Sequence, residues 1–198
     1  MRVGIFGGSF NPIHKGHVGI VQQILQLHLV DEVWLMVSPL NPLKQKEQSD
    51  ILPLEHRLQM AQLATESVSN IQVSDFEQHL PIPSYTITTL RALQAAYPTH
   101  EFVLIIGEDN WQRFPRWYES ETLRRDFDIL VYGRDTSGFI KAFHKDGRSA
   151  AWTDLPFFDI SSTQIRQDLR TGSHMLARRW LTPSVLAYIQ QHQLYQKD

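Results

Sequence analysis

The chain has 198 residues, of which 42% are hydrophobic and none is cysteine, and its formal net charge is −2. This length suits a single domain over residues 1–198 with a sizeable core, while the absence of thiols excludes disulfide bonds and fits a reducing compartment. The small net charge gives no electrostatic reason to expect nucleic acid or a membrane surface as partner, and no apolar stretch approaches the ~20 residues that span a bilayer, so we expect a cytoplasmic protein.

The first predicted elements are a strand, a glycine turn and a helix. A short apolar run over residues 3–6 ends in Gly7-Gly8, and from Val18 apolar residues recur at helical spacing. A strand that leads into a helix start is a common phosphate site, because free N–H groups meet the positive end of the helix dipole there. His14 and His17 lie three residues apart and share one face of the first turn. We expect both to point into the mouth of this turn, although two solvated histidines are the alternative.

The rest of the chain alternates predicted strands with predicted helices. Apolar runs predict strands over residues 33–37, 71–73, 101–107 and 127–132, and helical spacing predicts helices over 54–64, 86–96, 162–169 and 183–191. Residues 117–125 indicate a loop and a short helix, 135–151 an irregular surface excursion, and 152–158 a late strand. This alternation predicts an α/β fold, a Rossmann-like doubly wound parallel sheet in a single domain with C-terminal helices.

Several predicted strands end in residues that can bind phosphate. Because ligands of such sheets lie beyond the carboxyl ends of the strands, we expect these ends to converge on one cleft. The donors expected there are His14, His17, Lys44, Arg134, the Ser161-Ser162-Thr163 cluster and Arg166. There is no G-x-S-x-G elbow for acyl transfer. A catalytic zinc would need three protein ligands, and the other histidines lie scattered, so we name no metal ligand. The donor set favours a polyphosphate.

The segment Gly7-Gly8-Ser9-Phe10-Asn11-Pro12-Ile13-His14-Lys15-Gly16-His17 resembles the HxGH signature of the nucleotidyltransferase superfamily. Within it, the chain resembles nicotinate-nucleotide adenylyltransferases along nearly its whole length. The later matches are Ser84-Tyr85-Thr86, Ile106-Gly107-Glu108-Asp109, Trp117 and the segment from Ile160 to Arg166.

The resemblance implies an adenylyltransferase whose substrates are ATP and nicotinate mononucleotide. The mononucleotide phosphate would attack the α-phosphorus of ATP and release pyrophosphate, with Mg2+ entering as the companion of ATP. His17 would donate to the α-phosphate as charge develops, and His14 would hold the neighbouring phosphates. Lys44 would act as a flexible cation and Arg166 as a point charge on the distal phosphates. An exposed loop lysine is the alternative for Lys44, since Lys46 lies close by.

The resemblance also implies two sets of binding residues. The ATP-binding set is Gly7, Gly8, Ser9, Phe10, Gly107, Asp109, Arg134, Ile160, Ser161, Ser162 and Thr163; the acceptor-binding set is Asn11, Ser84, Tyr85, Thr86 and Trp117. Ser161 and Gln164 equally fit an ordinary capping box, and Trp117 could be a packing residue. The family more often has histidine where Leu43 stands and proline where Asp135 stands.

Other functions stay open at this stage. The acceptor could be nicotinamide mononucleotide, phosphopantetheine or a small alcohol phosphate with CTP. A non-catalytic nucleotide-binding module on the same fold is a different class of hypothesis. The Ser84-Tyr85-Thr86 and Trp117 matches favour a pyridine nucleotide, and the combination of both histidines with Lys44 and Arg166 favours an enzyme.

Overall fold

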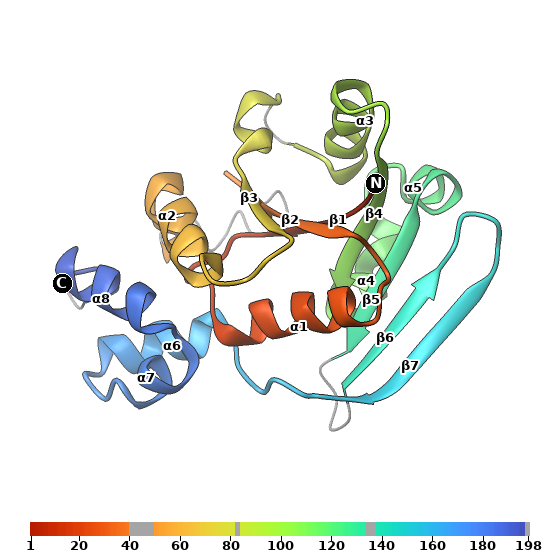
Figure 1. The fold of residues 1–198 in the computed structure, drawn as a ribbon. Coiled ribbons are helices and arrows are strands. Elements are labelled where there is room, and N and C mark those ends of the chain that lie inside the picture. The colour runs from red at the N-terminus through yellow and green to blue at the C-terminus, as the bar shows by residue number, and fades with distance from the viewer. Residues whose placement is uncertain (40–49, 82–83, 134–137, 197–198) are drawn as a thin grey trace.

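A computed structural model describes residues 1–39, 50–81, 84–133 and 138–196 (Figure 1). Its centre is a seven-stranded sheet of order β3-β2-β1-β4-β5-β6-β7. The strands are β1 (Arg2–Gly8), β2 (Glu32–Val37), β3 (Ile71–Ser74), β4 (Glu101–Gly107), β5 (Asp128–Gly133), β6 (Gly138–Phe143) and β7 (Ser149–Leu155). The first five are parallel. The predicted doubly wound α/β fold is confirmed, and its strand order reverses between β1 and β4.

Helices cover both faces of the sheet. One face carries α1 (Lys15–Gln26) and α2 (Leu54–Thr65), joined by the C-terminal helices α6 (Ser162–Arg170), α7 (Met175–Trp180) and α8 (Pro183–Gln191). The other face carries α3 (Thr86–Ala96), α4 (Glu108–Arg113) and α5 (Ser120–Asp126), with the 3-10 helices η2 (Phe76–His79) and η3 (Phe114–Arg116). Figure 1 shows α6, α7 and α8 gathered beside α1 and α2. None of the helices described is long and apolar enough to cross a membrane.

Strand β4 shows why the sheet could be predicted. Val103 and Ile105 pack into the core on the α1 face, whereas Leu104 and Ile106 pack into the core on the α3 face. A strand buried on both faces is apolar throughout rather than alternating, so residues 102–106 form a continuous hydrophobic run.

The prediction of an irregular excursion over residues 135–151 was wrong for its described part. Residues 138–155 form the antiparallel pair β6 and β7, which extends the sheet beyond β5. The late strand predicted from residue 152 begins instead at Ser149. Strand β7 is an edge with mostly exposed side chains, so its sequence carries no apolar pattern. The helices α4 and α7, six residues each, were also not predicted.

A polar cluster holds the β6–β7 hairpin to the strand ends opposite the glycine turn. The buried Asp128 carboxylate accepts hydrogen bonds from Arg2 Nη2 at 2.6 Å and from the Lys145 backbone N–H at 2.8 Å, and His144 Nδ1 lies 2.9 Å from it. Burial alone would raise the pKa of Asp128. The hydrogen bonds from Lys145, His144 and Arg2 outweigh burial and hold that pKa below its ordinary value.

Candidate active site

The carboxyl ends of β1, β4 and β5 open onto two adjoining cavities. One has a volume of about 300 Å³ and is lined by His14, His17 and Arg166, and we call it the histidine pocket. The other has a volume of about 190 Å³ and is lined by Tyr85 and Trp117, and we call it the tryptophan pocket. Both lie where the strand order reverses, the usual ligand position in doubly wound sheets. The wall that they share consists of Phe6, Gly7, Gly8, Asn110 and Tyr132.

The two histidines of the turn after β1 lie together. His14 is the N-cap residue of α1 and is buried, and its ring centre lies 3.7 Å from that of His17. His17 Nδ1 accepts the backbone N–H of His14 at 3.2 Å. A neutral ring that accepts at Nδ1 carries its proton on Nε2. The backbone of α1 therefore sets His17 in the tautomer that donates from Nε2.

Gly16 allows the histidine turn to pack closely. A Cβ at Gly16 would lie 2.9 Å from Ile160 Cγ2 and 3.0 Å from His14 Nδ1. Ile160 is itself buried in the core on this face. It supports the turn from behind, whereas Ser9 and Phe10 line the histidine pocket directly.

The start of α6 forms another wall of the histidine pocket. Ser161 caps the helix and makes the predicted capping box with Gln164, so that prediction is confirmed. Ser162 Oγ donates to the carbonyl of Pro12 at 2.9 Å, and Ser161, Ser162 and Thr163 all line the cavity. The hydroxyl groups of α6 thus face the histidine turn.

Arg166 is fixed against the same turn. Its Nη1 donates to the carbonyl of Asn11 at 2.8 Å, and its Nη2 lies 3.4 Å from Thr163 Oγ1. Its buried Nε has no hydrogen-bond partner among the residues that the structure describes. A guanidinium in this position can neutralise an anion in the pocket.

Helix α4 supplies polar residues from the end of β4. Asp109 lines the histidine pocket, and its Oδ1 lies 2.6 Å from the position that a Cβ would occupy on Gly107. Gly107 itself lines the tryptophan pocket. Asn110 and Arg113, which sequence reasoning missed, also line the histidine pocket.

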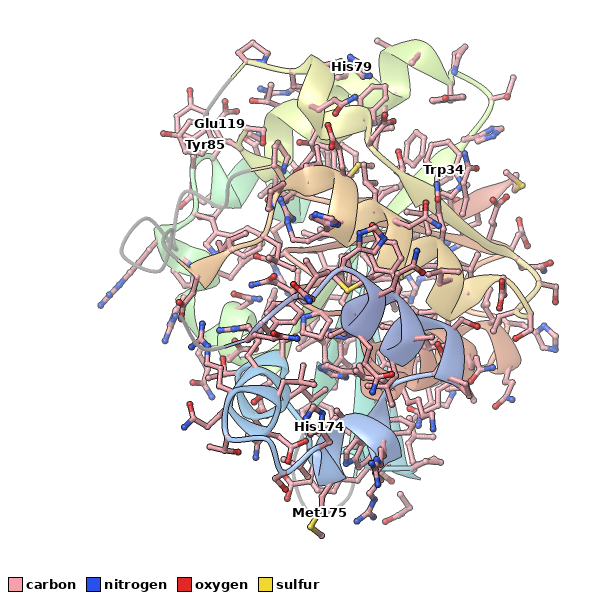
Figure 2. All side chains as sticks on the ribbon, turned by 90° about the vertical axis from the view of Figure 1, so that its left-hand side faces the viewer. Trp34, His79, Tyr85, Glu119, His174 and Met175 are labelled. Carbon is pink, nitrogen blue, oxygen red and sulfur yellow. The ribbon has the colours of Figure 1, made fainter. Side chains whose placement is uncertain are left out.

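The tryptophan pocket combines aromatic rings with the start of α3. Tyr85 is the N-cap residue of α3, and its ring centre lies 4.7 Å from that of Tyr118. Figure 2 shows Tyr85 on the same side of the molecule as Glu119 and away from Met175. Trp117 Nε1 is buried and has no partner within the described part of the chain. Ser84 and Thr86 complete the predicted group that lies together here.

Glu77 is a buried carboxyl group that lines the tryptophan pocket, and sequence reasoning missed it. Ser38 Oγ donates to its Oε2 at 2.6 Å, and Thr89 Oγ1 donates to its Oε1 at 3.0 Å. Burial raises the pKa of Glu77 above its ordinary value, although these two hydrogen bonds oppose the rise. Glu77 thereby ties the end of β2 to α3.

Three of the predicted site residues need separate mention. Lys44 and Arg134 lie outside the described residues. Asn11, predicted on the acceptor side, lines the histidine pocket instead of the tryptophan pocket. Its side-chain amide is used within the protein, because Nδ2 donates to the carbonyl of Asp50 at 2.8 Å and Oδ1 accepts the N–H of Leu52 at 3.3 Å.

The described residues include no group of three or more His, Asp or Glu side chains that could hold a metal ion. Asp109 is the one carboxylate that lines the histidine pocket in the described ranges. Magnesium keeps several waters and binds through few carboxylates plus substrate phosphates. The Asp109 carboxylate is compatible with a cation that is held mainly by nucleotide phosphates and water.

A cleft at the switch point of a doubly wound sheet, with paired histidines at a helix start, is the arrangement of an α/β nucleotide-binding protein. The chain belongs to the cytidylyltransferase-like family, whose model matches residues 5–168. The resemblance to nicotinate-nucleotide adenylyltransferases is confirmed by curated relatives.

Two of these relatives cover nearly the whole chain. A protein of Bacteroides fragilis named "Probable nicotinate-nucleotide adenylyltransferase" is 48% identical over 184 residues, which are 93% of this chain and 89% of the relative. A protein of Flavobacterium johnsoniae with the same name is 39% identical over 197 residues and covers 100% of both chains.

A solved structure shares the fold. The nicotinic acid mononucleotide adenylyltransferase of Plasmodium falciparum, complexed with NaAD, has a TM-score of 0.75 and 20% sequence identity. The similarity covers 98% of this chain and 97% of that one. It extends over the sheet and over the helices on both of its faces.

Proposed function

We propose that this protein transfers the adenylyl group of ATP to nicotinate mononucleotide, which gives nicotinate adenine dinucleotide and pyrophosphate. The observation that carries the proposal is the wall shared by the two pockets at Gly7-Gly8. One pocket presents histidines, hydroxyls and a guanidinium, and the other presents aromatic rings. Two nucleotides bound in these pockets would bring their phosphates together at the glycines, where no side chain keeps them apart.

In the histidine pocket, His17 Nε2 would donate to an oxygen of the α-phosphate as the acceptor phosphate attacks the phosphorus and the bond to the β-phosphate breaks. His14, Arg166 and the hydroxyls of Ser161 to Thr163 would hold the departing pyrophosphate. Such transfers depend mainly on positioning and on neutralising charge. No covalent intermediate with the protein is needed. From the resemblance we add Lys44 as a further cation.

On the nucleoside side, Asp109 would accept hydrogen bonds from the ribose of ATP. Arg134 is assigned to the adenine from the resemblance alone. Mg2+ would accompany the triphosphate and supply further charge neutralisation, held mainly by phosphate oxygens and water.

In the tryptophan pocket, the Trp117 ring would stack on the pyridine ring of the acceptor. Free N–H groups at the start of α3, next to Tyr85 and Thr86, would face the ring carboxylate. The proposed preference for nicotinate over nicotinamide rests on this charge, because a helix N-terminus favours an anion over a neutral amide.

The test is pyrophosphate release by purified protein with ATP, Mg2+ and each acceptor in turn. We expect release with nicotinate mononucleotide and a fall of about 10²–10³ in kcat for His17→Ala, the usual effect of removing one donor to developing charge. The matched control is His79→Ala, because His79 has a side chain 68% exposed at the edge of the molecule seen in Figure 2.

The other possible outcomes would change either the proposed function or the role proposed for His17. Release with nicotinamide mononucleotide and none with the nicotinate form would replace the proposed acceptor. Release with phosphopantetheine alone would do the same. ATP binding without release for any acceptor would favour a non-catalytic nucleotide-binding module. Full turnover by His17→Ala would remove His17 from its proposed role.

A further inference from the structure

The C-terminal end of the chain reaches the histidine turn. After α8 the backbone adopts positive φ angles at Gln193 (51°) and Tyr195 (60°), and the side chains of Leu194 and Tyr195 are buried. Non-glycine residues seldom adopt this left-handed conformation, and it persists only where surrounding contacts hold it. Residues 192–196, which we call the tail, are therefore held in place against the rest of the domain.

The contact that the tail makes is specific. The Tyr195 hydroxyl donates to Asn11 Oδ1 at 2.8 Å, across 184 residues of sequence. Burial raises the pKa of Tyr195, while the charges of Arg166 and Arg57 oppose the rise, so the hydroxyl is neutral at physiological pH. The amide oxygen of Asn11 can only accept, which fixes the hydroxyl as the donor.

Asn11 passes this constraint to the histidine pocket. The backbone carbonyl of Asn11 accepts a hydrogen bond from Arg166 Nη1 at 2.8 Å, and the backbone carbonyl of Pro12 accepts one from Ser162 Oγ at 2.9 Å. Two residues further on lies His14, the cap of α1. A shift of the Asn11 side chain would therefore move the backbone that aligns the arginine with the histidines.

We infer that Tyr195 is a positioning residue for the reaction. Its hydroxyl holds Asn11, and through Asn11 it sets the turn over residues 9–14 so that His17 and Arg166 face one triphosphate. This inference rests on the proposed adenylyl transfer. The alternative is that the Tyr195 ring simply fills the core, of which it is a member.

Removal of one oxygen atom separates these two roles. Tyr195→Phe keeps the ring and deletes the hydroxyl. The matched control is Tyr188→Phe on α8, because the Tyr188 hydroxyl lies 2.9 Å from His56 Nδ1 and outside both pockets. Small misplacements of reacting groups cost up to about 10²-fold in rate. We expect Tyr195→Phe to lower kcat by about 10–100-fold, with the KM for the acceptor unchanged, and Tyr188→Phe to match the wild type.

Hydrogen exchange provides a readout that needs no activity. We expect the amides of residues 9–14 to exchange faster in Tyr195→Phe than in the wild type or in Tyr188→Phe. Unchanged exchange or unchanged kcat in Tyr195→Phe would overturn the inference, and so would an equal loss of kcat in both variants. A wild-type protein that releases no pyrophosphate would refute the proposed function, and the exchange comparison alone would then decide whether Tyr195 positions the turn.

Discussion

Replacing Arg57 by methionine should destabilise the domain more than any surface substitution. Arg57 lies in α2, is 1% exposed, and donates to backbone carbonyls of the segments that follow β1 and β2. Its acceptors are Leu52 O, Ser9 O and Ser38 O, each at 2.8 Å, and Pro39 O at 3.4 Å. Burial lowers the pKa of Arg57, because removal from water disfavours the charged guanidinium.

The magnitude follows from the three short bonds. A hydrogen bond to a charged group contributes about 1.5–3 kcal/mol. Methionine avoids the desolvation cost of the guanidinium but leaves buried carbonyls without their donor. A buried carbonyl left without its donor costs about 1–3 kcal/mol. Three such losses, less the recovered desolvation of the guanidinium, should lower the free energy of unfolding by about 3–5 kcal/mol.

The assay is urea unfolding followed by tryptophan fluorescence and circular dichroism. Arg91→Met is the matched control, because Arg91 pairs with Glu119 at the surface with a side chain 52% exposed, and exposed pairs contribute about 0–1 kcal/mol. A loss below about 1 kcal/mol for Arg57→Met, with an unchanged m value, would refute the reasoning.

Three further predictions concern other parts of the molecule. Asp128→Asn should lower the free energy of unfolding by about 1.5–3 kcal/mol at pH 7. The folded-state pKa of Asp128 is lowered, so the Asp128 carboxylate stabilises the fold fully above its unfolded-state pKa, and this stabilisation is lost as pH falls through its folded-state pKa. The difference in unfolding free energy between Asp128→Asn and the wild type should therefore shrink at low pH, and a difference that stays constant down to pH ~2 would contradict this prediction. Trp117→Ala should raise the KM for the acceptor roughly 5–100-fold, the range for loss of one stacking contact, while an equal rise in the KM for ATP would show that stacking is not its role. Gly133→Ala should lower the unfolding free energy by about 1–3 kcal/mol, since a Cβ would lie 1.9 Å from Phe139 Cε1. The double variant Gly133→Ala/Phe139→Ala should recover part of that loss, and thermal unfolding of the single and the double variant provides the comparison.

Sequence reasoning predicted the parallel part of the sheet because burial on both faces leaves a one-dimensional signal. Residues 102–106 are apolar without interruption and form the centre of β4. Strand β7 gave no such signal, since most of its residues are exposed and only Trp152 and Leu155 pack against the core. Helix α4 was missed because residues 108–113 combine charged and polar residues with a single tryptophan, and six residues show too little periodicity.

The same contrast holds at the pockets. The two histidines could be placed because they lie between a strand end and a helix start, whereas the α6 hydroxyls and Arg166 were assigned to the phosphates from the resemblance to the family, and all of them line the histidine pocket. The positions of Arg57, Glu77 and Tyr195 near the pockets could not be predicted from the sequence. The partners of Arg57 are backbone carbonyls, which every residue has, and those of Glu77 and Tyr195 are distant in sequence. A polar residue of this kind looks like an ordinary surface residue until the fold is known.

These buried polar groups explain how irregular segments can hold a precise site. The segments after β1 and β2 leave the sheet, so their carbonyls lose the ladder partners that a strand supplies. Arg57 replaces those partners for Ser9 and Ser38, and Arg166 does so for Asn11. Because each arginine also fixes the direction of the segment that it binds, substitution of Arg57 or Arg166 should reduce the stability of the protein and its turnover together. Substitutions in β7, which touches neither pocket, should affect stability alone.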